Sequence, residues 1–306
     1  VIDHLRQHAA ALAGLLANGE ARSTDLVAVD GRLDAFVPLE MTKTMADSVK
    51  QAVPSLVIQE VGQNGSDNVV LNHKRPPFDN PAVRRAISLA MDRHAFVQGV
   101  RHGGAVVGAS MMPKPFGIWG LPDQDLRALP GYRGSAQDKA EAKRLLAAAG
   151  YGPGKPLHVE MVTRSISIYL DVASFVVDQL RQVGVESTLK QMDSGAWFPA
   201  LARRDYQIGA NLTAGGFDDP DAYFFENYKC GSSRNYTDYC SEEMDRLIDQ
   251  QSQELDRAKR LKLVADIQRK LEADVARPML SWRNEYFTQW PYVRNLVPHH
   301  SLYNYS

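Results

Sequence analysis

Residues 217–240 bring together side chains that could do chemistry. The stretch reads FDDPDAYFFENYKCGSSRNYTDYC, with three aspartates within four positions and the chain's only two cysteines, Cys230 and Cys240. Carboxylates and thiols are groups that hold metal ions, and carboxylates also serve as catalytic acids. The alternative is structural, namely a capped helix followed by a disulfide that closes a loop.

The aspartates favour a helix start over a metal site. A calcium loop places acids at alternating positions around a central glycine, and Pro220 interrupts that pattern. Asp219 fits an N-cap, Pro220 the first helical position, and Asp221 a first-turn acid whose charge complements the helix dipole. We therefore predict no metal ion and no catalytic acid pair here.

The two cysteines predict a disulfide. They lie in a loop rich in Gly, Ser and Asn, with no second CxxC and no neighbouring histidine to complete a zinc site. Oxidation would close a ring of 11 residues and restrict the unfolded chain by about 3 kcal/mol. Such a bond persists mainly outside the cytosol, so we expect an extracytoplasmic location. Two free thiols in a loop are the alternative.

Other signatures of catalysis or of special partners are missing from the sequence. It contains no GxSxG, HExxH, Walker or EF-hand pattern, so we expect no catalytic residues and no cofactor. A net charge of −1 and a pI near 6.8 argue against nucleic acid as a partner. No apolar run approaches the roughly 20 residues that span a bilayer. Because the chain starts at Val1 without a signal sequence, we expect a processed or excised segment.

Arginines form the remaining group of interest. Residues 82–101 carry Arg84, Arg85, Arg93 and Arg101, which we interpret as solvated or paired charges rather than an anion site. Arg164 follows a predicted strand at its carboxyl end, where open α/β sheets place ligand contacts. It could hold a carboxylate through two parallel hydrogen bonds, or it could be a simple surface arginine.

The elements that would position these residues follow an α/β pattern. Strands at 157–163 and 185–192 flank a helix with apolar residues at helical spacing, which predicts parallel strands joined by a right-handed connection. Further expected elements are strands at 56–61, 68–73 and 207–212 and helices at 5–16, 42–51, 82–101, 135–149, 196–203, 241–253 and 256–275. The first two of these strands are separated by an expected turn, QNGSD. Residues 105–134 form a long loop with buried-looking Met and Trp, which favours a functional segment over disorder.

Several segments resemble one protein family in the family's own order. They are NHKRPPFDNPAVRRAISLAMDR (72–93), MMPKPFGIWGLP (111–122), GYGPGKPL (150–157), the DDPD stretch from 218, and RPMLSWRNEYF (277–287). Together they are similar to the family-5 extracytoplasmic solute-binding proteins, the dipeptide, oligopeptide and nickel binding subunits of ABC importers. The resemblance covers Gly31 to the end, and residues 1–30 match nothing that we can place.

The resemblance implies a fold and a division of the chain. It implies an α/β, periplasmic-binding-protein-like (type II) lobe, with a mixed central sheet flanked by helices. The implied domains are residues 1–55 as an N-terminal and lobe-connecting segment, 56–290 as the second ligand-binding lobe, and 291–306 as a segment returning to a first lobe. That first lobe is expected to be missing, so this chain alone should bind ligand more weakly than a two-lobed protein.

The resemblance also implies site residues. Arg164 is similar in position to an arginine that grips the ligand carboxylate. With Asp219 and its neighbours aligned, Thr213 and Gly216 stand where dipeptide binders carry a tryptophan and the aspartate that anchors the ligand ammonium. Such a charge-assisted bond is worth about 1.5–3 kcal/mol, so a free-amine dipeptide is not the expected ligand. Further candidate ligand contacts are Asp218 as a substitute anchor, Phe217, Met111 and Trp119.

The leading interpretation is therefore a periplasmic binding subunit that is not an enzyme. It would capture a small peptide or related solute and deliver it to the permease subunits of an ABC transporter. One alternative is a metal-dependent hydrolase that uses Asp218, Asp219 and Asp221. A second alternative is a binding lobe fused to a sensor or regulator.

Overall fold

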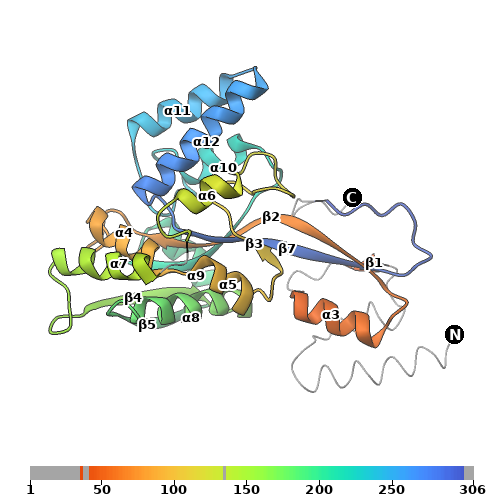
Figure 1. Ribbon diagram of the computed structural model, residues 1–306, viewed down its shortest axis with the longest axis horizontal. Coiled ribbons are helices and arrows are strands. Elements are labelled where there is room, and N and C mark those ends of the chain that lie inside the picture. Colours follow the sequence, from red (N-terminus) through yellow and green to blue (C-terminus); the bar gives the residue numbers. More distant parts are fainter. Residues whose placement is uncertain (1–34, 37–40, 134–135, 300–306) are drawn as a thin grey trace.

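The computed structural model describes residues 35–36, 41–133 and 136–299 as a mixed sheet with helices on both faces (Figure 1). The strands are β1 (Ala35–Phe36), β2 (Val57–Leu71), β3 (Ala105–Val106), β4 (Leu157–Arg164), β5 (Val185–Met192), β6 (Ile208–Ala214) and β7 (Met279–Gln289). The helices are α3 (Lys43–Ala52), α4 (Pro81–Ala90), α5 (Arg93–Gly99), α6 (Asp123–Ala128), α7 (Ala136–Ala148), α8 (Ser167–Arg181), α9 (Ser194–Ala202), α10 (Pro220–Asn227), α11 (Glu242–Gln253) and α12 (Arg257–Asp274). The expected helix at 5–16 and the expected cap Ser135 lie outside the described residues.

The order of the strands places three carboxyl ends at one edge of the sheet. The order is β1-β7-β2-β6-β4-β5, with β3 paired to β7. Strand β4 runs parallel to β5 and β6, whereas β2 is antiparallel to β6 and β7. The predicted β4–α8–β5 unit and the mixed sheet are thus confirmed. Since β4, β5 and β6 share one direction, the segments that follow them lie near one another.

Strand β2 corrects one sequence prediction. The expected strands at 56–61 and 68–73 form a single strand of 15 residues, and the QNGSD turn between them was wrong. Its pairing with β7 shifts register between Gly62 and Ser66, which marks a bulge in β2. The partner strands β6 and β7 therefore override the local turn preference of these residues, because pairing and burial outweigh propensity within a sheet.

The expected helix 82–101 is a second correction, since the structure divides it into α4 and α5. The Asp92 carboxylate accepts a hydrogen bond from the backbone N–H of Ala95 and starts the second helix. A short acidic side chain inside a helical sequence competes for backbone donors, and here it begins a new helix. Asn80 caps α4 and Pro81 is its first residue, both as predicted.

Two large apolar cores lie on opposite faces of the sheet. One lies between the strands and α4, α7 and α8. The other lies beneath α10, α11 and α12 and includes Met111, Met112 and Trp282. Within the described residues, no helix has the length and apolar character of a membrane span.

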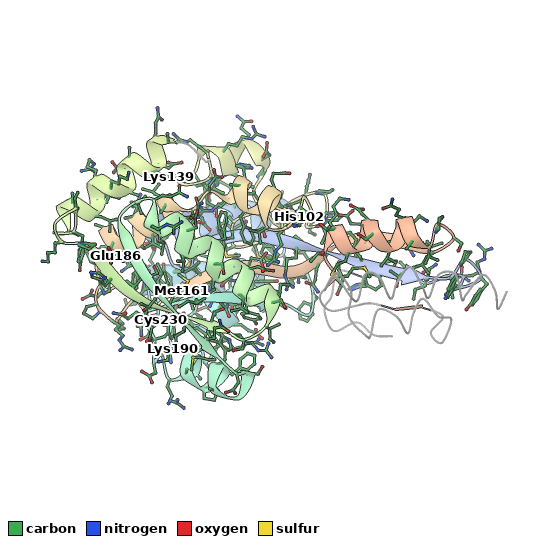
Figure 2. All side chains as sticks on the ribbon, turned by 90° about the horizontal axis from the view of Figure 1, so that it is seen from below. His102, Lys139, Met161, Glu186, Lys190 and Cys230 are labelled. Atoms are coloured by element: carbon green, nitrogen blue, oxygen red, sulfur yellow. A yellow bond between two sulfur atoms is a disulfide. The ribbon has the colours of Figure 1, made fainter. Side chains whose placement is uncertain are left out.

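A smaller apolar core stabilises an extension of the body that we call the arm. The arm consists of α3, β1, residues 57–61 of β2 and residues 285–289 of β7, and it projects from one side of the body (Figures 1 and 2). Its own apolar cluster is formed by Met41, Ala46, Val49, Val53, Leu56 and Tyr286. His102 lies where the arm leaves the body (Figure 2). The domain limits at 55–56 and 290–291 stay a prediction.

Candidate functional site

The candidate site lies at the edge where β4 and β6 end, on the side of the body from which the arm projects (Figure 1). Strand β4 ends at Arg164, and β6 leads into the loop 215–219 before α10. The 108–122 loop contacts this second loop through the hydrogen bonds described below. Most of the residues predicted as ligand contacts are therefore gathered on two strand ends and one adjoining loop.

Arg164 is fixed from several sides. Its Nε donates a 2.7 Å hydrogen bond to Oγ of Ser194, the first residue of α9. The guanidinium carbon lies 5.1 Å from the ring centre of Phe198 and 5.5 Å from that of Tyr169. Burial raises the pKa of Tyr169, and the neighbouring Arg164 opposes that rise. A half-buried guanidinium held through Nε and by two rings is suited to bind a carboxylate with its outer nitrogens.

Asp218 connects the two loops of the site. One of its carboxylate oxygens accepts a 3.1 Å hydrogen bond from the backbone N–H of Ile118, and its carbonyl accepts a 3.0 Å bond from the indole N–H of Trp119. The carbonyl of Trp119 in turn accepts from Gln268 of α12 at 2.8 Å. Asp218 thus has a structural role that sequence reasoning missed, because its partners lie about one hundred residues away.

The other two acids of the DDPD stretch are held by Arg260. Asp219 caps α10 through the backbone N–H of Asp221, as predicted. Arg260 lies 3.0 Å from Asp219 and 3.4 Å from Asp221, and its guanidinium stacks 4.8 Å from the ring centre of Trp119. These carboxylates are therefore paired with a cation rather than presented to a metal ion. Across the described residues, no group of three His, Cys, Asp or Glu side chains is placed to hold a metal ion.

The remaining predicted contacts differ in their exposure. Phe217 is 61% exposed, and Ile118 on the facing loop is 48% exposed. Gly216 lies half-buried in the turn before Phe217. Trp119 is largely buried and Met111 is completely buried in the core beneath α10–α12. The structure gives Met111 a packing position with no exposed surface.

Thr213 belongs to a polar network behind the loop. Its hydroxyl oxygen accepts from the side-chain amides of Asn68 and Asn211 at 3.0 and 3.2 Å, and from Arg277 at 3.1 Å. Arg277 is almost completely buried, and burial lowers its pKa. The network holds the end of β6, from which the loop 215–219 starts.

A charged cluster on β2 and β7 was not predicted from the sequence. Asp67 is fully buried and accepts bonds of 3.0 and 2.7 Å from Arg101 and of 2.7 Å from Ser281. Nε of Arg283 lies 3.9 Å from the same carboxylate. A Cβ at Gly65 would lie 2.6 Å from the end of the Arg283 side chain, so a larger residue here would displace that guanidinium. The alternating charged residues in SWRNEYF could have indicated a charged cluster on this strand. Their partner Asp67, however, falls in the expected QNGSD turn.

The disulfide prediction is confirmed on the far side of α10. Cys230 and Cys240 are bonded, with a Cα–Cα distance of 4.7 Å. The backbone N–H of Cys230 donates to Asp245 of α11 at 3.0 Å. The bond therefore fixes the connection between α10 and α11.

Comparison with known sequences agrees with the family resemblance. A family model described as bacterial extracellular solute-binding proteins, family 5 Middle, matches residues 19–235. The probable di/tripeptide-binding protein 5 of Pseudomonas aeruginosa is 26% identical over 220 residues, which cover 69% of this chain and 38% of the relative. The periplasmic oligopeptide-binding protein OppA of Escherichia coli is 25% identical, covering 67% of this chain and 37% of the relative. The chain thus spans about two fifths of the length of these relatives.

Solved structures share the fold. The oligopeptide-binding protein AppA of Bacillus subtilis, in complex with a nonapeptide, superposes with a TM-score of 0.74 at 20% identity, covering 97% of this chain and 57% of that one. The murein tripeptide binding protein MppA of Escherichia coli gives a TM-score of 0.72 at 19% identity, covering 88% and 52%. The expected type II periplasmic-binding-protein architecture is therefore confirmed.

Proposed function

The chain belongs to family 5 of the bacterial extracellular solute-binding proteins, and from this membership we propose that it provides one ligand-binding lobe of a periplasmic ABC-importer subunit. The proposed ligand is a small peptide or a related solute that carries a carboxylate. Support comes from the names of the relatives, which include di/tripeptide- and oligopeptide-binding proteins. Members of this family bind solutes and are not enzymes, and the pairing of Asp219 and Asp221 with Arg260 agrees with a binding role.

The observation that carries the proposal is the position of Arg164. Its side chain is held at the carboxyl end of β4 by Ser194 and two aromatic rings, which leaves its fork geometry fixed before any ligand binds. Preorganisation of this kind saves the entropy of ordering a long side chain on binding. A carboxylate bound by both outer nitrogens would gain two charge-assisted hydrogen bonds.

The loop 215–219 would supply the second part of the ligand surface. We assign Phe217 and the facing Ile118 as apolar contacts, because both are large, exposed and adjacent to the Asp218 connection. Contacts of Thr213, Gly216, Asp218 and Trp119 with a ligand remain predictions. If a ligand ammonium group bound Asp218, it would have to share a carboxylate that already accepts a hydrogen bond from the backbone N–H of Ile118.

The proposal is tested by ligand binding to the full-length protein. Native mass spectrometry of protein purified without added ligand should reveal a retained solute of peptide-like mass. In calorimetry, tri-alanine should bind, and Arg164→Gln should weaken it about tenfold or more through loss of a charge-assisted bond. Tri-alanine amide, which has no terminal carboxylate, should bind weakly to both the wild-type protein and the Arg164→Gln variant.

The matched control is Arg203→Gln. Arg203 is exposed at the far end of α9, so this variant removes the same charge away from the site. Equal losses in the two variants would show a general charge effect and contradict the role of Arg164. If no peptide-like solute is retained and neither tri-alanine nor longer peptides bind, the proposed function itself is wrong. Delivery to permease subunits is tested by uptake of the bound solute in cells with and without the gene.

A further inference from the structure

Helix α9 presents an exposed aromatic ring beside Arg164. Ser194 is its first residue, and Phe198 lies about one turn later on the same face of the helix. The hydroxyl of Ser194 accepts the 2.7 Å bond from Arg164, and the ring centre of Phe198 lies 5.1 Å from the guanidinium carbon. The preceding residue, Trp197, is fully buried against the ring of Tyr169, whereas Phe198 is 47% exposed. Helix α9 therefore buries one aromatic residue and leaves its neighbour at the surface of the candidate site.

Other apolar side chains lie close to Arg164. Met192 of β5 is its register partner on the neighbouring strand, and Ile166 follows it by two residues along the chain. Both are half-buried and pack on the apolar cluster that contains Tyr169 and Trp197. A group that binds to Arg164 therefore meets apolar surface next to the positive charge.

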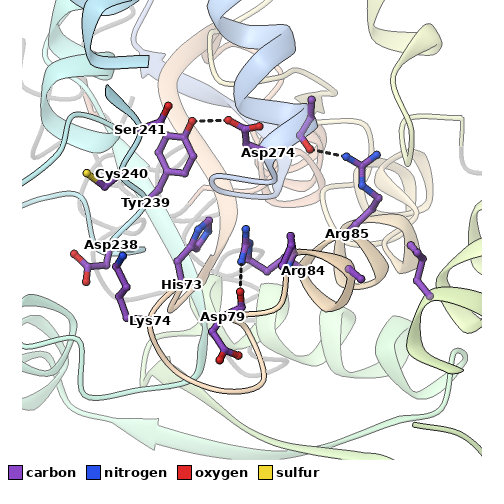
Figure 3. Close-up of a pocket in the computed structure, with 14 residues that line it drawn as sticks. His73, Lys74, Asp79, Arg84, Arg85, Asp238, Tyr239, Cys240, Ser241 and Asp274 are labelled. Carbon is purple, nitrogen blue, oxygen red and sulfur yellow. Dashed lines mark hydrogen bonds between the residues drawn. The ribbon is translucent and has the colours of Figure 1, made fainter. Parts of the chain in front are cut away.

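Arg164 is not neutralised by an acid of the described chain. Its contacts within the described residues are the hydroxyl of Ser194 and two aromatic side chains, and no carboxylate forms an ion pair with it. The arginines of the cavity that follows β2 differ in this respect (Figure 3). That cavity is lined by both signs of charge, because its cations share it with Asp79, Asp238 and Asp274. Arg164 thus keeps its charge available for a carboxylate that is not part of the described chain.

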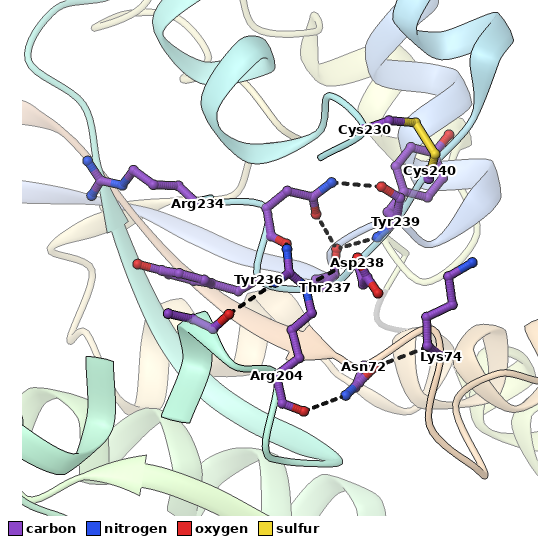
Figure 4. A network of polar contacts seen from close by, with 12 residues as sticks. Asn72, Lys74, Arg204, Cys230, Arg234, Tyr236, Thr237, Asp238, Tyr239 and Cys240 are labelled. Atoms are coloured by element: carbon purple, nitrogen blue, oxygen red, sulfur yellow. Dashed lines mark hydrogen bonds and ion pairs between the residues drawn. A yellow bond between two sulfur atoms is a disulfide. The ribbon is translucent and has the colours of Figure 1, made fainter. Parts of the chain in front are cut away.

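A polar network anchors the carboxyl end of α9 (Figure 4). Arg204 follows the helix by two residues, and its Nε lies 3.2 Å from the carboxylate of Asp238. The carbonyl of Arg204 accepts a 2.8 Å bond from the side-chain amide of Asn72, which follows β2. Since the first residue of α9 is bonded to Arg164 and its last turn is anchored here, the helix holds Phe198 in a fixed position.

We infer that Phe198 selects the side chain next to the ligand carboxylate, so that the preferred ligand ends in an apolar residue. The inference rests on the proposed function, because it takes Arg164 as the group that binds the carboxylate. Two parallel hydrogen bonds of about 2.8 Å would hold a carboxylate against the guanidinium, and the substituent on the adjoining carbon then lies within reach of the Phe198 ring. Contact of an apolar substituent with this ring removes apolar surface from water, whereas a polar substituent would lose hydration against a ring that offers it little in return.

Calorimetry with peptides that differ only in their last residue tests the inference. Ala-Ala-Leu should bind the full-length protein about tenfold more tightly than Ala-Ala-Asn, because leucine and asparagine are similar in size but differ in polarity. In Phe198→Ala this ratio should fall towards one, and in Phe198→Leu most of it should remain. Phe198 is exposed on α9, so its replacement leaves the buried core intact.

The matched control is Leu255→Ala. Leu255 is a highly exposed apolar residue in the connection between α11 and α12, away from Arg164, and this variant should keep the wild-type ratio. A ratio that falls equally in Leu255→Ala and Phe198→Ala would contradict the role of Phe198. If Phe198→Ala weakened both peptides equally and kept their ratio, Phe198 would only position Arg164, and the inference would be wrong.

Tri-alanine separates a failure of this inference from a failure of the proposed function. If tri-alanine binds through Arg164 but the wild-type protein does not prefer Ala-Ala-Leu to Ala-Ala-Asn, the inference is overturned and the proposed function stands. If tri-alanine, Ala-Ala-Leu and Ala-Ala-Asn all fail to bind, the inference is overturned together with the peptide ligand on which it rests. A preference for Ala-Ala-Leu that depends on Phe198 supports both.

Discussion

His73 is a histidine that the fold keeps neutral. Burial lowers its pKa from 6.5 to about 3, and the nearby charges of Arg84 and Lys74 act in the same direction. Its ring also makes an edge contact with Tyr239, with the ring centres 5.7 Å apart. Protonation would place a further positive charge beside two cations, so the folded state resists it.

His73 should therefore make a contribution to stability that falls as the pH drops below 6.5. Between the unfolded pKa of 6.5 and the folded pKa of about 3, the unfolded state binds a proton that the folded state does not. His73 alone should lower the free energy of unfolding by about 2 kcal/mol between pH 7 and pH 5. Urea unfolding at both pH values measures the change in stability, and the change in His73→Gln should differ from that in the wild type by this amount, with the variant losing less stability towards pH 5. His158→Gln, at an exposed histidine of β4, should retain the wild-type difference, and an equal difference in all three proteins would contradict the assignment.

Roles that depend on local sequence were predictable at this scale, and roles that depend on distant partners were not. Asp219 and Asp221 were correctly assigned to a helix start because capping involves only the next few residues. The bond from Ile118 to Asp218 and the pairing of Asp67 with Arg101 join segments far apart in the chain. No spacing in the sequence reveals such partners, since the fold brings them together.

The same distinction holds for whole elements. The β4–α8–β5 unit was predicted because its periodicity is strong and its pairing is between neighbours in sequence. Strand β2 was not predicted as one continuous strand, because its central residues favour a turn. They become a strand only because they pair with β6 and β7. Strand β7 was not predicted as a strand, and its residues were singled out only within a segment of the family resemblance, since its buried charged residues hide the usual alternation of a strand.

Removing the disulfide should weaken the protein without changing its fold. The loop between Cys230 and Cys240 is also held by Asn235 and Thr237, so its folded geometry does not rest on the bond alone. The main loss is the restriction of the unfolded chain, about 3 kcal/mol for a ring of this size. Urea unfolding of Cys230→Ser/Cys240→Ser should show that loss with an unchanged circular dichroism spectrum. A reductant should shift the wild-type midpoint and not that of the double variant, and a shift in neither protein would count against the bond.

At the scale of the whole molecule, the arm and the body share strands but have separate cores. β2 and β7 run through both, whereas the apolar cluster under α3 is distinct from the two clusters that cover the faces of the sheet. Helix α3 is therefore supported by a small core on a narrow sheet, while α8 is packed into the largest core. Stability is expected to differ between regions that differ in this way.

Hydrogen exchange should accordingly show two levels of protection. Peptides from α3 should exchange through local opening, at a lower free energy than peptides from β4, α8 and β5, which should exchange only in global unfolding. Val49→Ala, which removes a buried side chain of the arm, should speed exchange in α3 and leave the body unchanged. Val176→Ala, in the core beneath α8, should instead lower the global free energy of unfolding by on the order of 1–3 kcal/mol. Mass spectrometry of exchanged peptides measures the exchange of the arm and of the body in each variant. If Val49→Ala accelerated exchange equally in arm and body, the shared strands would unite the two into one cooperative unit, contrary to this prediction.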